Sequence, residues 1–356
     1  MWDWVNPHED VVTQPGKGAL GGLPVVSVIV IFLNGETFLE EAIESVLAQT
    51  LAEWELFLVD DGSTDRSAEI AKRYARELPD KVRYLEHEKH VNRGMSASRN
   101  LAIRQANGSY IAFLDADDVW LPQKLKRQVA ILEKESLIAM VYGPPLMWYG
   151  WSGSPADAKK DFLLSNLGAA ANTSILPPTL VPFMLGKAQR GGTPLPSCIM
   201  IRRDTCIRLG GFEEAFRGLF EDMVFAAKVL LAEPVWISDE CWLKYRQHPA
   251  AASGSPDRRR YVAALVAYFN WLEDYLVRQK VEDAATWEIV RRKLFPYRHP
   301  LRYRLLQLVA FVTNYRRSIA EVKGLIVQLA RIALPESWYR KLVFIWRLFF
   351  KSVANA

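Results

Sequence analysis

The chain has 356 residues, of which 50% are hydrophobic and 24% charged, an ordinary composition for a soluble globular protein with one large domain or two smaller ones. Its formal charge of +5 is unevenly distributed, because residues 291–356 hold 14 Lys and Arg against two acids and so carry +12, which leaves −7 for residues 1–290. Three cysteines at no metal-ligand spacing favour a reducing compartment, and the lack of any run of about 18 apolar residues argues against a helix that spans a bilayer.

The first part of the chain predicts a flexible tail followed by alternating strands and helices. Residues 1–24 have neither the basic start nor the apolar core of a secretory signal. From Val25 onward, β-branched apolar runs alternate with amphipathic segments. Such βαβ units predict a mostly parallel sheet with helices on both faces, and ligands that bind beyond the carboxyl ends of the strands. Strands are predicted over 25–34, 54–61, 81–87 and 110–118, and helices over 36–50, 62–77 and 96–106.

The second part predicts a long irregular region and then a return to regular structure. Residues 143–196 are rich in Gly, Pro and Trp, and an irregular region this long inside a domain is often functional. After it we expect a strand and a helix over 197–212, a helix over 220–233, a strand-like segment over 234–248 and mostly helices beyond 257. The predicted organisation is a tail (1–24), an α/β domain (25–255, with halves 25–120 and 121–255) and a basic helical extension (256–356).

Three carboxylates, Asp115, Asp117 and Asp118, follow the apolar run of the fourth predicted strand. Clustered carboxylates repel each other unless a cation lies between them, and hard oxygen ligands suit Mg²⁺ or Mn²⁺. The D-x-D spacing at a strand end therefore predicts a divalent-metal site, although a solvated acidic loop that caps the next helix has the same sequence.

Other polar residues are candidates for the same site. Asp60 and Asp61 end the second predicted strand, where a carboxylate can accept a hydrogen bond from a nucleotide base or simply form a capped turn. Glu221 and Asp222 lie near a helix N-terminus, where a carboxylate can act as a general base or only complement the helix dipole. His248 offers a nitrogen ligand for a metal, whereas a lone surface histidine has no such role.

Taken together, these segments resemble the family-2 glycosyltransferases of the GT-A fold, a Rossmann-like α/β fold. The stretches "VSVIVIFLNGETFLEEAIESVLAQT", "WELFLVDDGSTD" and "NRGMSASRNLAIRQANGSYIAFLDADDVWLPQKLKRQV" resemble the nucleotide-binding half of that family. "SCIMIRRDTCIRLGGFEEAFRGLFEDMVFAAKVL" resembles the acceptor half, and "YRQHPAAAS" resembles its closing segment. The resemblance covers about residues 25–253, and the order of several motifs makes it specific.

The resemblance implies a site for a nucleoside diphosphate sugar, most often UDP-linked in this family. Asp61 would bind the base, Asp115 the ribose or the sugar, and Asp117 with His248 a divalent metal, Mn²⁺ or Mg²⁺, on the diphosphate. The implied donor-site residues are Ile31, Phe32, Leu33, Asn34, Glu36, Asp61, Arg99, Asp115, Ala116 and Asp117.

The resemblance also implies the reaction, a single displacement that inverts the anomeric carbon. Asp222 would take the proton from the acceptor hydroxyl, with Glu221 and Arg246 nearby. One position departs from the family pattern, because many relatives place an aromatic residue before the first-strand Asn, whereas Leu33 precedes Asn34 here. The departure puts base stacking in question and leaves the fold unaffected.

The basic tail indicates where such an enzyme works. Residues 336–356 place aromatic and apolar side chains on one helical face and cations opposite, as in helices that lie on anionic membranes, although a helix packed on the domain has the same pattern. We expect a non-processive enzyme, cytoplasmic and peripheral at the inner face of the plasma membrane, that uses a glycan or lipid-linked acceptor and binds no nucleic acid.

Three other classes of protein share parts of this pattern. A sugar nucleotidyltransferase needs a Gly-rich loop with a basic residue after the first strand, which "IFLNGET" lacks. A dinucleotide oxidoreductase is excluded because no G-x-G-x-x-G follows that strand. A catalytically silent binding or scaffold protein stays open, although the complete set Asp61, Asp115, Asp117 and Asp222 argues against it.

Overall fold

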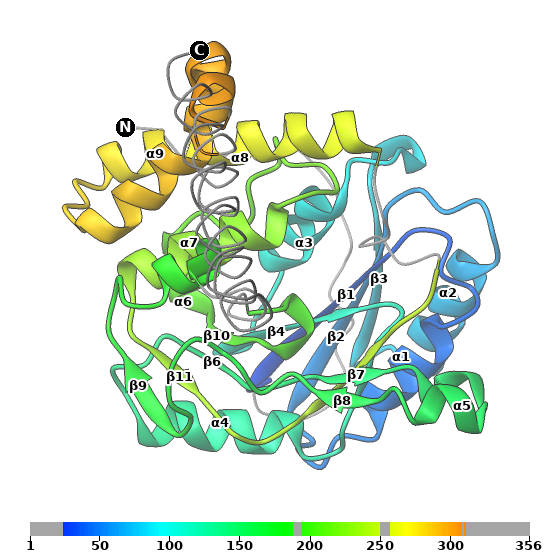
Figure 1. Ribbon diagram of the computed structural model, residues 1–356. Coiled ribbons are helices and arrows are strands. Elements are labelled where there is room, and N and C mark those ends of the chain that lie inside the picture. The colour runs from blue at the N-terminus through cyan, green and yellow to red at the C-terminus, as the bar shows by residue number, and fades with distance from the viewer. Residues whose placement is uncertain (1–23, 188–193, 250–256, 308–309, 311–356) are drawn as a thin grey trace, which may run out of the picture. The chain divides into compact units, whose positions relative to one another are not determined.

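The computed structural model describes residues 24–187, 194–249, 257–307 and 310 (Figure 1). The predicted N-terminal tail and the predicted amphipathic helix over 336–356 therefore lie outside the described residues. The chain separates into two compact units, residues 1–289 and 290–356. All of the candidate site residues belong to the first unit.

The centre of the first unit is an eight-stranded sheet in the order β3-β2-β1-β4-β10-β6-β11-β9. All seven residues of β1 and of β2 are buried, since both faces of the sheet are covered there. The first four strands pair in parallel, as the repeated βαβ pattern predicts. Their bounds are Val26–Phe32 (β1), Trp54–Asp60 (β2), Val82–Glu86 (β3) and Tyr110–Asp115 (β4).

Helices cover both faces of this sheet (Figure 1). The strand order 3-2-1-4 requires the chain to reverse direction across the sheet after β3, so right-handed crossovers put α3 on the face opposite to α1 and α2. Helices α3 and α7 lie on one side and α1, α2 and α4 on the other. The helix bounds are Leu39–Leu47 (α1), Ser67–Glu77 (α2), Met95–Ile103 (α3), Lys124–Lys134 (α4), Pro155–Ala158 (α5), Arg203–Arg208 (α6), Glu221–Ala232 (α7), Arg258–Arg278 (α8) and Ala284–Arg298 (α9).

The second half of the chain extends this sheet and adds a smaller one. β10 runs antiparallel to β4 and to β6, and β11 pairs with β6 and β9. A four-stranded sheet of order β5-β12-β7-β8 lies apart from these pairings. The bounds are Val119–Trp120 (β5), Met140–Tyr142 (β6), Leu146–Trp148 (β7), Phe162–Leu163 (β8), Thr173–Ile175 (β9), Met200–Arg202 (β10), Val235–Ile237 (β11) and Leu243–Arg246 (β12).

Two sequence predictions are corrected by these strands. The segment 234–248 was expected as one strand-like unit, but it forms β11 in the large sheet and β12 in the small one, because the turn between them moves the chain from one sheet to the other. The region 143–196 was expected to be irregular, but it holds the short strands β7, β8 and β9. Strand β7 pairs with β12 and strand β9 pairs with β11, and both partners are distant in sequence. A local sequence pattern cannot predict such pairings.

The core continues from the sheet into the α7 layer through aromatic side chains. The ring of Phe212 stacks on that of Phe225 in α7, with centroids 4.2 Å apart and planes 8° apart. The ring of Phe113 in β4 meets both of them edge-on. These contacts fix the distance between the end of β4 and α7, the two elements that bear the candidate catalytic acids.

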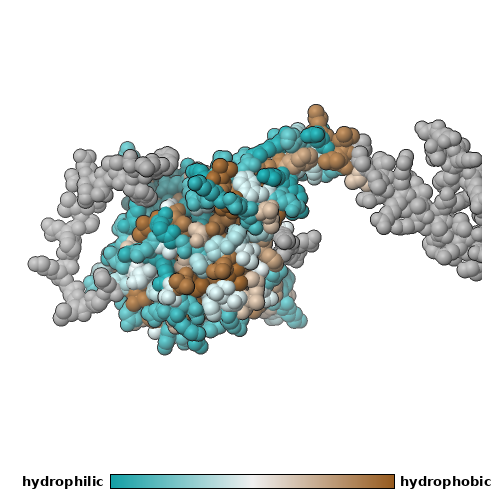
Figure 2. Space-filling view, turned by 90° about the vertical axis from the view of Figure 1, so that its left-hand side faces the viewer, coloured by the Kyte–Doolittle hydropathy of each residue, from teal (hydrophilic) through white to brown (hydrophobic). Residues whose placement is uncertain are grey.

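The surface of the described residues is mixed in polarity. On the face drawn in Figure 2, separate hydrophobic patches are surrounded by hydrophilic side chains. Among the residues that the structure describes, no helix has the length and apolar character needed to cross a membrane.

Candidate functional site

The carboxyl ends of three strands meet at one edge of the large sheet. The register pairs Phe32 with Asp60 and Ile31 with Asp115, so β1, β2 and β4 end side by side. Parallel strands place the residues that follow them at the same edge, where ligands bind in open α/β sheets. The geometry thus brings the acidic candidates together as the strand order predicts.

The predicted base-pocket residues occupy different environments. Ile31 and Phe32 are buried within β1, whereas Leu33 is 47% exposed. Asn34 has a left-handed backbone with φ 52°, and its side-chain oxygen accepts the N–H of Thr64 at 2.7 Å. Of these three apolar residues, Leu33 is therefore the one whose side chain is available to a ligand at this edge.

The turn after β1 is tied to the turn after β2 by a second set of hydrogen bonds. The backbone N–H of Glu36 donates to Asp65, and the Glu36 carboxylate accepts the N–H of Arg66 at 3.0 Å. These bonds make Glu36 part of the frame that holds the two turns together.

Asp61 is 4% exposed and faces the loop before α3. Its Oδ1 accepts the N–H groups of Arg93 at 2.7 Å and Gly94 at 3.0 Å, and its Oδ2 also accepts from Gly94 at 3.0 Å. A carboxylate oxygen has two lone pairs, so Oδ2 can accept one more N–H, such as that of a base. The backbone bonds orient the carboxylate for that purpose.

A second acidic group lies beside this one. Ligand atoms of Asp60, Glu86 and His90 lie within 4.8 Å of one another, close enough to hold a metal ion. The Asp60 carboxylate, however, already accepts the N–H of Ser63 at 2.8 Å and the hydroxyl of Tyr84 at 3.1 Å. Hydrogen bonds of the chain itself therefore account for the arrangement of this group.

The D-x-D residues have three different environments. Asp115 accepts a bond from Arg99 at 2.7 Å, and Asp117 Oδ2 lies 3.0 Å from His248 Nε2. Asp118 is fully buried, and its Oδ1 accepts the backbone N–H of Arg246 at 3.0 Å. The backbone of Ala116 completes the turn between the first two carboxylates, so the D-x-D turn is joined to the end of β12.

The charges of this turn favour a bound cation. Burial, followed by the charge of Asp115, raises the pKa of Asp117. Burial, followed by the charges of Asp117 and Asp115, raises the pKa of Asp118 well above its usual range. A carboxylate and an imidazole are both metal ligands, and a cation held by Asp117 and His248 would relieve the repulsion that raises the pKa of Asp117. The residues present therefore fit a divalent metal.

Aromatic rings surround His248 and Arg246. The His248 ring lies 4.8 Å from that of Phe38 and 6.3 Å from that of Trp151. The Arg246 guanidinium lies 4.4 Å from the Phe38 ring and 4.5 Å from that of Trp148, and its Nε donates to the carbonyl of Asp117 at 2.7 Å. The contacts hold the imidazole against Asp117. Phe38 and the two tryptophans were not expected from sequence, where the only indication was the Trp-rich composition of 143–196.

Arg99 connects the D-x-D turn with the start of α7. It is 2% exposed, it donates to Asp115, and its Nη1 lies 3.8 Å from Glu221 Oε1. The same Nη1 has no hydrogen-bond partner among the residues that the structure describes. One buried guanidinium thus stands between the acids of β4 and those of α7.

The two acids of α7 have raised proton affinities. Burial and then the charge of Asp222 raise the pKa of Glu221 to about 7, against the lowering effect of Arg99. Burial also raises the pKa of Asp222, whose Oδ1 accepts the N–H of Met223 at 2.7 Å. A carboxylate with raised proton affinity at a helix start is suited to take a proton from a hydroxyl near neutral pH.

Helix α8 supports the residue before these acids. Phe220 has a left-handed backbone, φ 67°, and its ring stacks on that of Tyr268 with centroids 5.4 Å apart and planes 11° apart. The Tyr268 hydroxyl is buried with no hydrogen-bond partner among the described residues, and burial and the charge of Asp222 raise its pKa. No sequence pattern indicated Tyr268, since one aromatic residue in an amphipathic helix is an ordinary core residue.

Comparison with known proteins assigns the family. The family model described as glycosyl transferase family 2 matches residues 27–172. The chain is 32% identical over 197 residues to the putative teichuronic acid biosynthesis glycosyltransferase TuaG of Bacillus subtilis, an alignment that covers 54% of this chain and 74% of TuaG. The chain belongs to glycosyltransferase family 2. The family predicted from the sequence motifs is confirmed.

Two other similar glycosyltransferases align with this chain over a smaller fraction of their own length. The putative glycosyltransferase EpsE of Bacillus subtilis is 44% identical over 111 residues, which are 31% of this chain and 39% of EpsE. The UDP-Glc:alpha-D-GlcNAc-diphosphoundecaprenol beta-1,3-glucosyltransferase WfgD of Escherichia coli is 33% identical over 165 residues, which are 45% of this chain and 63% of WfgD. The chain therefore spans well under two thirds of EpsE.

Solved structures of glycosyltransferases share the fold of this family-2 chain. TarS of S. aureus in complex with UDP-GlcNAc matches with a TM-score of 0.57 at 20% identity, over 76% of this chain and 73% of that one. The mannosyltransferase PcManGT of Pyrobaculum calidifontis, in complex with GDP-Man and Mn²⁺, matches with a TM-score of 0.51 at 17% identity, over 94% of this chain and 87% of that one. The mixed α/β GT-A fold predicted from sequence is confirmed.

Proposed function

We propose that this chain transfers a sugar, with inversion, from a UDP-linked sugar to a hydroxyl of a glycan or lipid-linked acceptor. The observation that carries the proposal is the 3.0 Å contact between Asp117 and His248, which joins a carboxylate at the end of β4 to an imidazole 131 residues later. Two similar proteins support the donor class, because TarS was solved with UDP-GlcNAc and WfgD is named for UDP-Glc.

Asp61 and Asp115 bind the donor nucleoside in this proposal. The free lone pair of Asp61 Oδ2 accepts the N–H of the base, and the hydrogen bonds from the 93–94 backbone hold the carboxylate in place. Asp115 contacts the ribose or the sugar while Arg99 fixes its position at 2.7 Å. Leu33 is the exposed apolar side chain at this edge and covers one face of the base.

Asp117 and His248 hold a divalent metal, Mn²⁺ or Mg²⁺, in this proposal. When bound, such an ion offsets the negative charge of the departing diphosphate. PcManGT, which shares the fold, was solved with Mn²⁺. Arg246 and the rings of Phe38 and Trp151 keep His248 oriented toward Asp117.

Asp222 is the general base in this proposal. Its raised pKa keeps it basic enough to accept the proton of the acceptor hydroxyl as that oxygen attacks the anomeric carbon. The raised pKa of Glu221, about 7, lets this side chain hold a proton near neutral pH while Asp222 is ionised. Two neighbouring carboxylates with different surroundings can thus have different roles.

We propose that the enzyme acts at the inner face of the plasma membrane. The basic residues 291–356 would bind anionic lipid there. The assignment is based on the charge of +12 over residues 291–356 and on the lipid-linked acceptor in the name of WfgD. The amphipathic helix predicted over 336–356 lies outside the described residues. Deletion of 336–356 should weaken binding to vesicles that contain anionic lipid, and unchanged binding would contradict this assignment.

Thermal unfolding with nucleotides tests the donor site. A ligand that binds only the folded chain raises its stability, by about 2.7 kcal/mol at a concentration of 100 Kd. UDP and UDP-sugars should raise the melting temperature in the presence of Mn²⁺, and Asp117→Ala should abolish the effect. Asp80→Ala, which removes an exposed carboxylate, is the matched control. A chain that responds to no nucleotide, or an Asp117→Ala variant that responds as the wild type does, would overturn the proposal.

A further inference from the structure

A buried tyrosine hydroxyl near the first turn of α7 has no hydrogen bond. Tyr268, in α8, is 0% exposed, and its hydroxyl has no partner among the residues that the structure describes. A buried polar group without a partner costs free energy of folding, and a phenylalanine in the same place would fill the volume without that cost. Such a group calls for an explanation, and a role at a functional site is one.

The ring of Tyr268 packs against the residue from which α7 begins. Phe220 stacks on it with centroids 5.4 Å apart and planes 11° apart. The backbone of Phe220 is left-handed, φ 67°, and Gly218 just before it has φ 104°, a region that a residue with a side chain adopts at a cost. The stack therefore helps to hold the conformation that sets where the first turn of α7, with Glu221 and Asp222, begins.

The hydroxyl on this ring lies close to Asp222. Burial raises the pKa of Tyr268 first, and the charge of Asp222 raises it further, an effect that requires the two side chains to be near each other. The Asp222 carboxylate accepts the N–H of Met223 at 2.7 Å, a bond within its own turn of α7. Its remaining lone pairs can accept a bond from a phenol. An unused donor and an acceptor with spare lone pairs thus lie in one region of the interior.

The charged neighbours of Asp222 are Arg99, Asp115 and Glu221, and none of them gives it a hydrogen bond. Arg99 donates to Asp115 at 2.7 Å, and its unpartnered Nη1 lies 3.8 Å from Glu221, the other acid of the pair. Burial raises the pKa of Asp222, and a hydrogen bond from a neutral group would stabilise its ionised form against that effect. The hydroxyl of Tyr268 is suited to make that bond.

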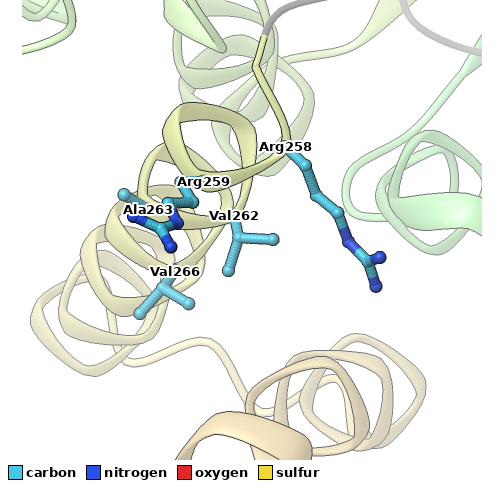
Figure 3. A pocket seen from close by; sticks show the side chains of 5 residues that line it. All are labelled: Arg258, Arg259, Val262, Ala263 and Val266. Carbon is cyan, nitrogen blue, oxygen red and sulfur yellow. The ribbon is translucent and has the colours of Figure 1, made fainter.

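The open surface of α8 lies on its other side. Figure 3 shows Val262 and Val266 along an open groove that Ala263 also lines. At 3.6 residues per turn, Ala263 and Val266 lie roughly 140–160° around the helix from Tyr268. The groove therefore lies on the side of α8 away from Phe220, and the buried side of the helix is the one that meets α7.

We propose that Tyr268 is a positioning residue whose hydroxyl donates a hydrogen bond to the Asp222 carboxylate when donor and acceptor are bound. The inference rests on the proposed function, in which Asp222 takes the proton of the acceptor hydroxyl. Catalytic hydrogen bonds are often long in a free enzyme and shorten in the complex, so a small shift at the start of α7 completes the bond. The bond orients Asp222 and stabilises its ionised form. The proton that leaves the acceptor goes to Asp222, and Tyr268 keeps its own.

The variant Tyr268→Phe tests the inference, because it keeps the stacked ring and removes the hydroxyl alone. The assay is the release of UDP from UDP-GlcNAc with Mn²⁺, with water as the acceptor hydroxyl, from pH 5 to pH 9. The kcat should fall about tenfold, the effect of one hydrogen bond to a charged group, while the KM for UDP-GlcNAc changes by less than about twofold. The acid limb of the kcat profile should move up by about one pH unit, because Asp222 loses a bond to its ionised form.

Stability separates this role from a structural one. The hydroxyl has no partner among the described residues of the free chain, so Tyr268→Phe should be at least as stable as the wild type in urea. Lower kcat together with undiminished stability is expected of a positioning residue and not of a residue that only maintains the fold. A variant that is less stable, and that loses affinity for UDP as much as it loses kcat, would overturn the inference.

Two further variants serve as controls. Tyr275→Phe makes the same change two turns further along the same face of α8, where burial and the charge of Glu213, rather than that of Asp222, raise the pKa of the tyrosine. It should leave kcat and the pH profile unchanged. In a Glu221→Gln background, the shift of the acid limb that Tyr268→Phe causes should persist, which assigns the limb to Asp222 and not to its neighbour. Disappearance of the shift in that background would contradict the inference.

The same measurements separate this inference from the proposed function. If the wild type releases no UDP, or if Asp222→Asn releases it at the wild-type rate, the proposed base is wrong and the role of Tyr268 falls with it. If release depends on Asp222 but Tyr268→Phe matches the wild type in kcat and in pH profile, the base stands and this inference is refuted.

Discussion

Replacement of Glu221 by Gln should change how stability depends on pH. Glu221 is 7% exposed, and burial beside Asp222 raises its pKa from the ordinary 4.5 to about 7. The folded chain therefore binds this proton more tightly than the unfolded chain, by about 3 kcal/mol at ~1.4 kcal/mol per pH unit. Because the folded pKa is the higher one, this contribution is fully present below pH 4.5 and is lost as the pH rises through 7. Gln stays neutral at every pH, so the stability of Glu221→Gln does not fall for this reason as the pH rises.

The assay is urea unfolding followed by tryptophan fluorescence, at pH 5, 6, 7 and 8, in buffer with a metal chelator. The free energy of unfolding of Glu221→Gln, relative to wild type, should increase steadily from pH 5 to pH 8, by up to about 3 kcal/mol. Glu69→Gln, which changes an exposed acid of α2, should show no such trend. A difference that stays constant within about 0.5 kcal/mol would show that Glu221 is ionised normally in the folded chain, and the account of the α7 acids would be wrong.

Three further changes test other parts of the site. Asp222→Asn should lower kcat by about 10²- to 10⁴-fold while UDP binding persists, and near wild-type turnover would remove Asp222 as the base. Tyr268→Phe should raise the free energy of unfolding by about 1 kcal/mol in urea, because it deletes a buried hydroxyl without a partner among the described residues; a loss of stability would reveal a bond that this hydroxyl makes. Gly62→Ala should cost about 1–3 kcal/mol, since φ is +89° and the new Cβ would lie 2.9 Å from the N atom of Asn92; an unchanged melting temperature would contradict the described loop packing.

The nucleotide-binding half could be predicted because each of its strands has a recognisable pattern within its own short stretch of sequence. The apolar runs of β1, β2 and β4 are buried on both faces, so their sequence shows as continuous β-branched stretches. Parallel topology then places the residues after these strands at one edge, which brings Asp61 and Asp115 together without any knowledge of their contacts.

The rest of the site depends on contacts between distant segments. The split of 234–248 into β11 and β12 follows from pairing with β6 and β7, and short strands carry too few residues for a periodic pattern. The rings of Phe38 and Trp151 meet His248 only after those pairings form. Sequence motifs could name His248 as a candidate, whereas its neighbours required the structure.

The 131 residues between Asp117 and His248 also order events during synthesis. A nascent chain that has left the ribosome as far as β4 holds the carboxylate but not the imidazole, and a long loop must close before the two meet, which costs chain entropy. The four parallel strands β1 to β4 can therefore pair before both of the proposed metal ligands are present. In the proposed function, a cation would then add stability only to chains that extend past His248.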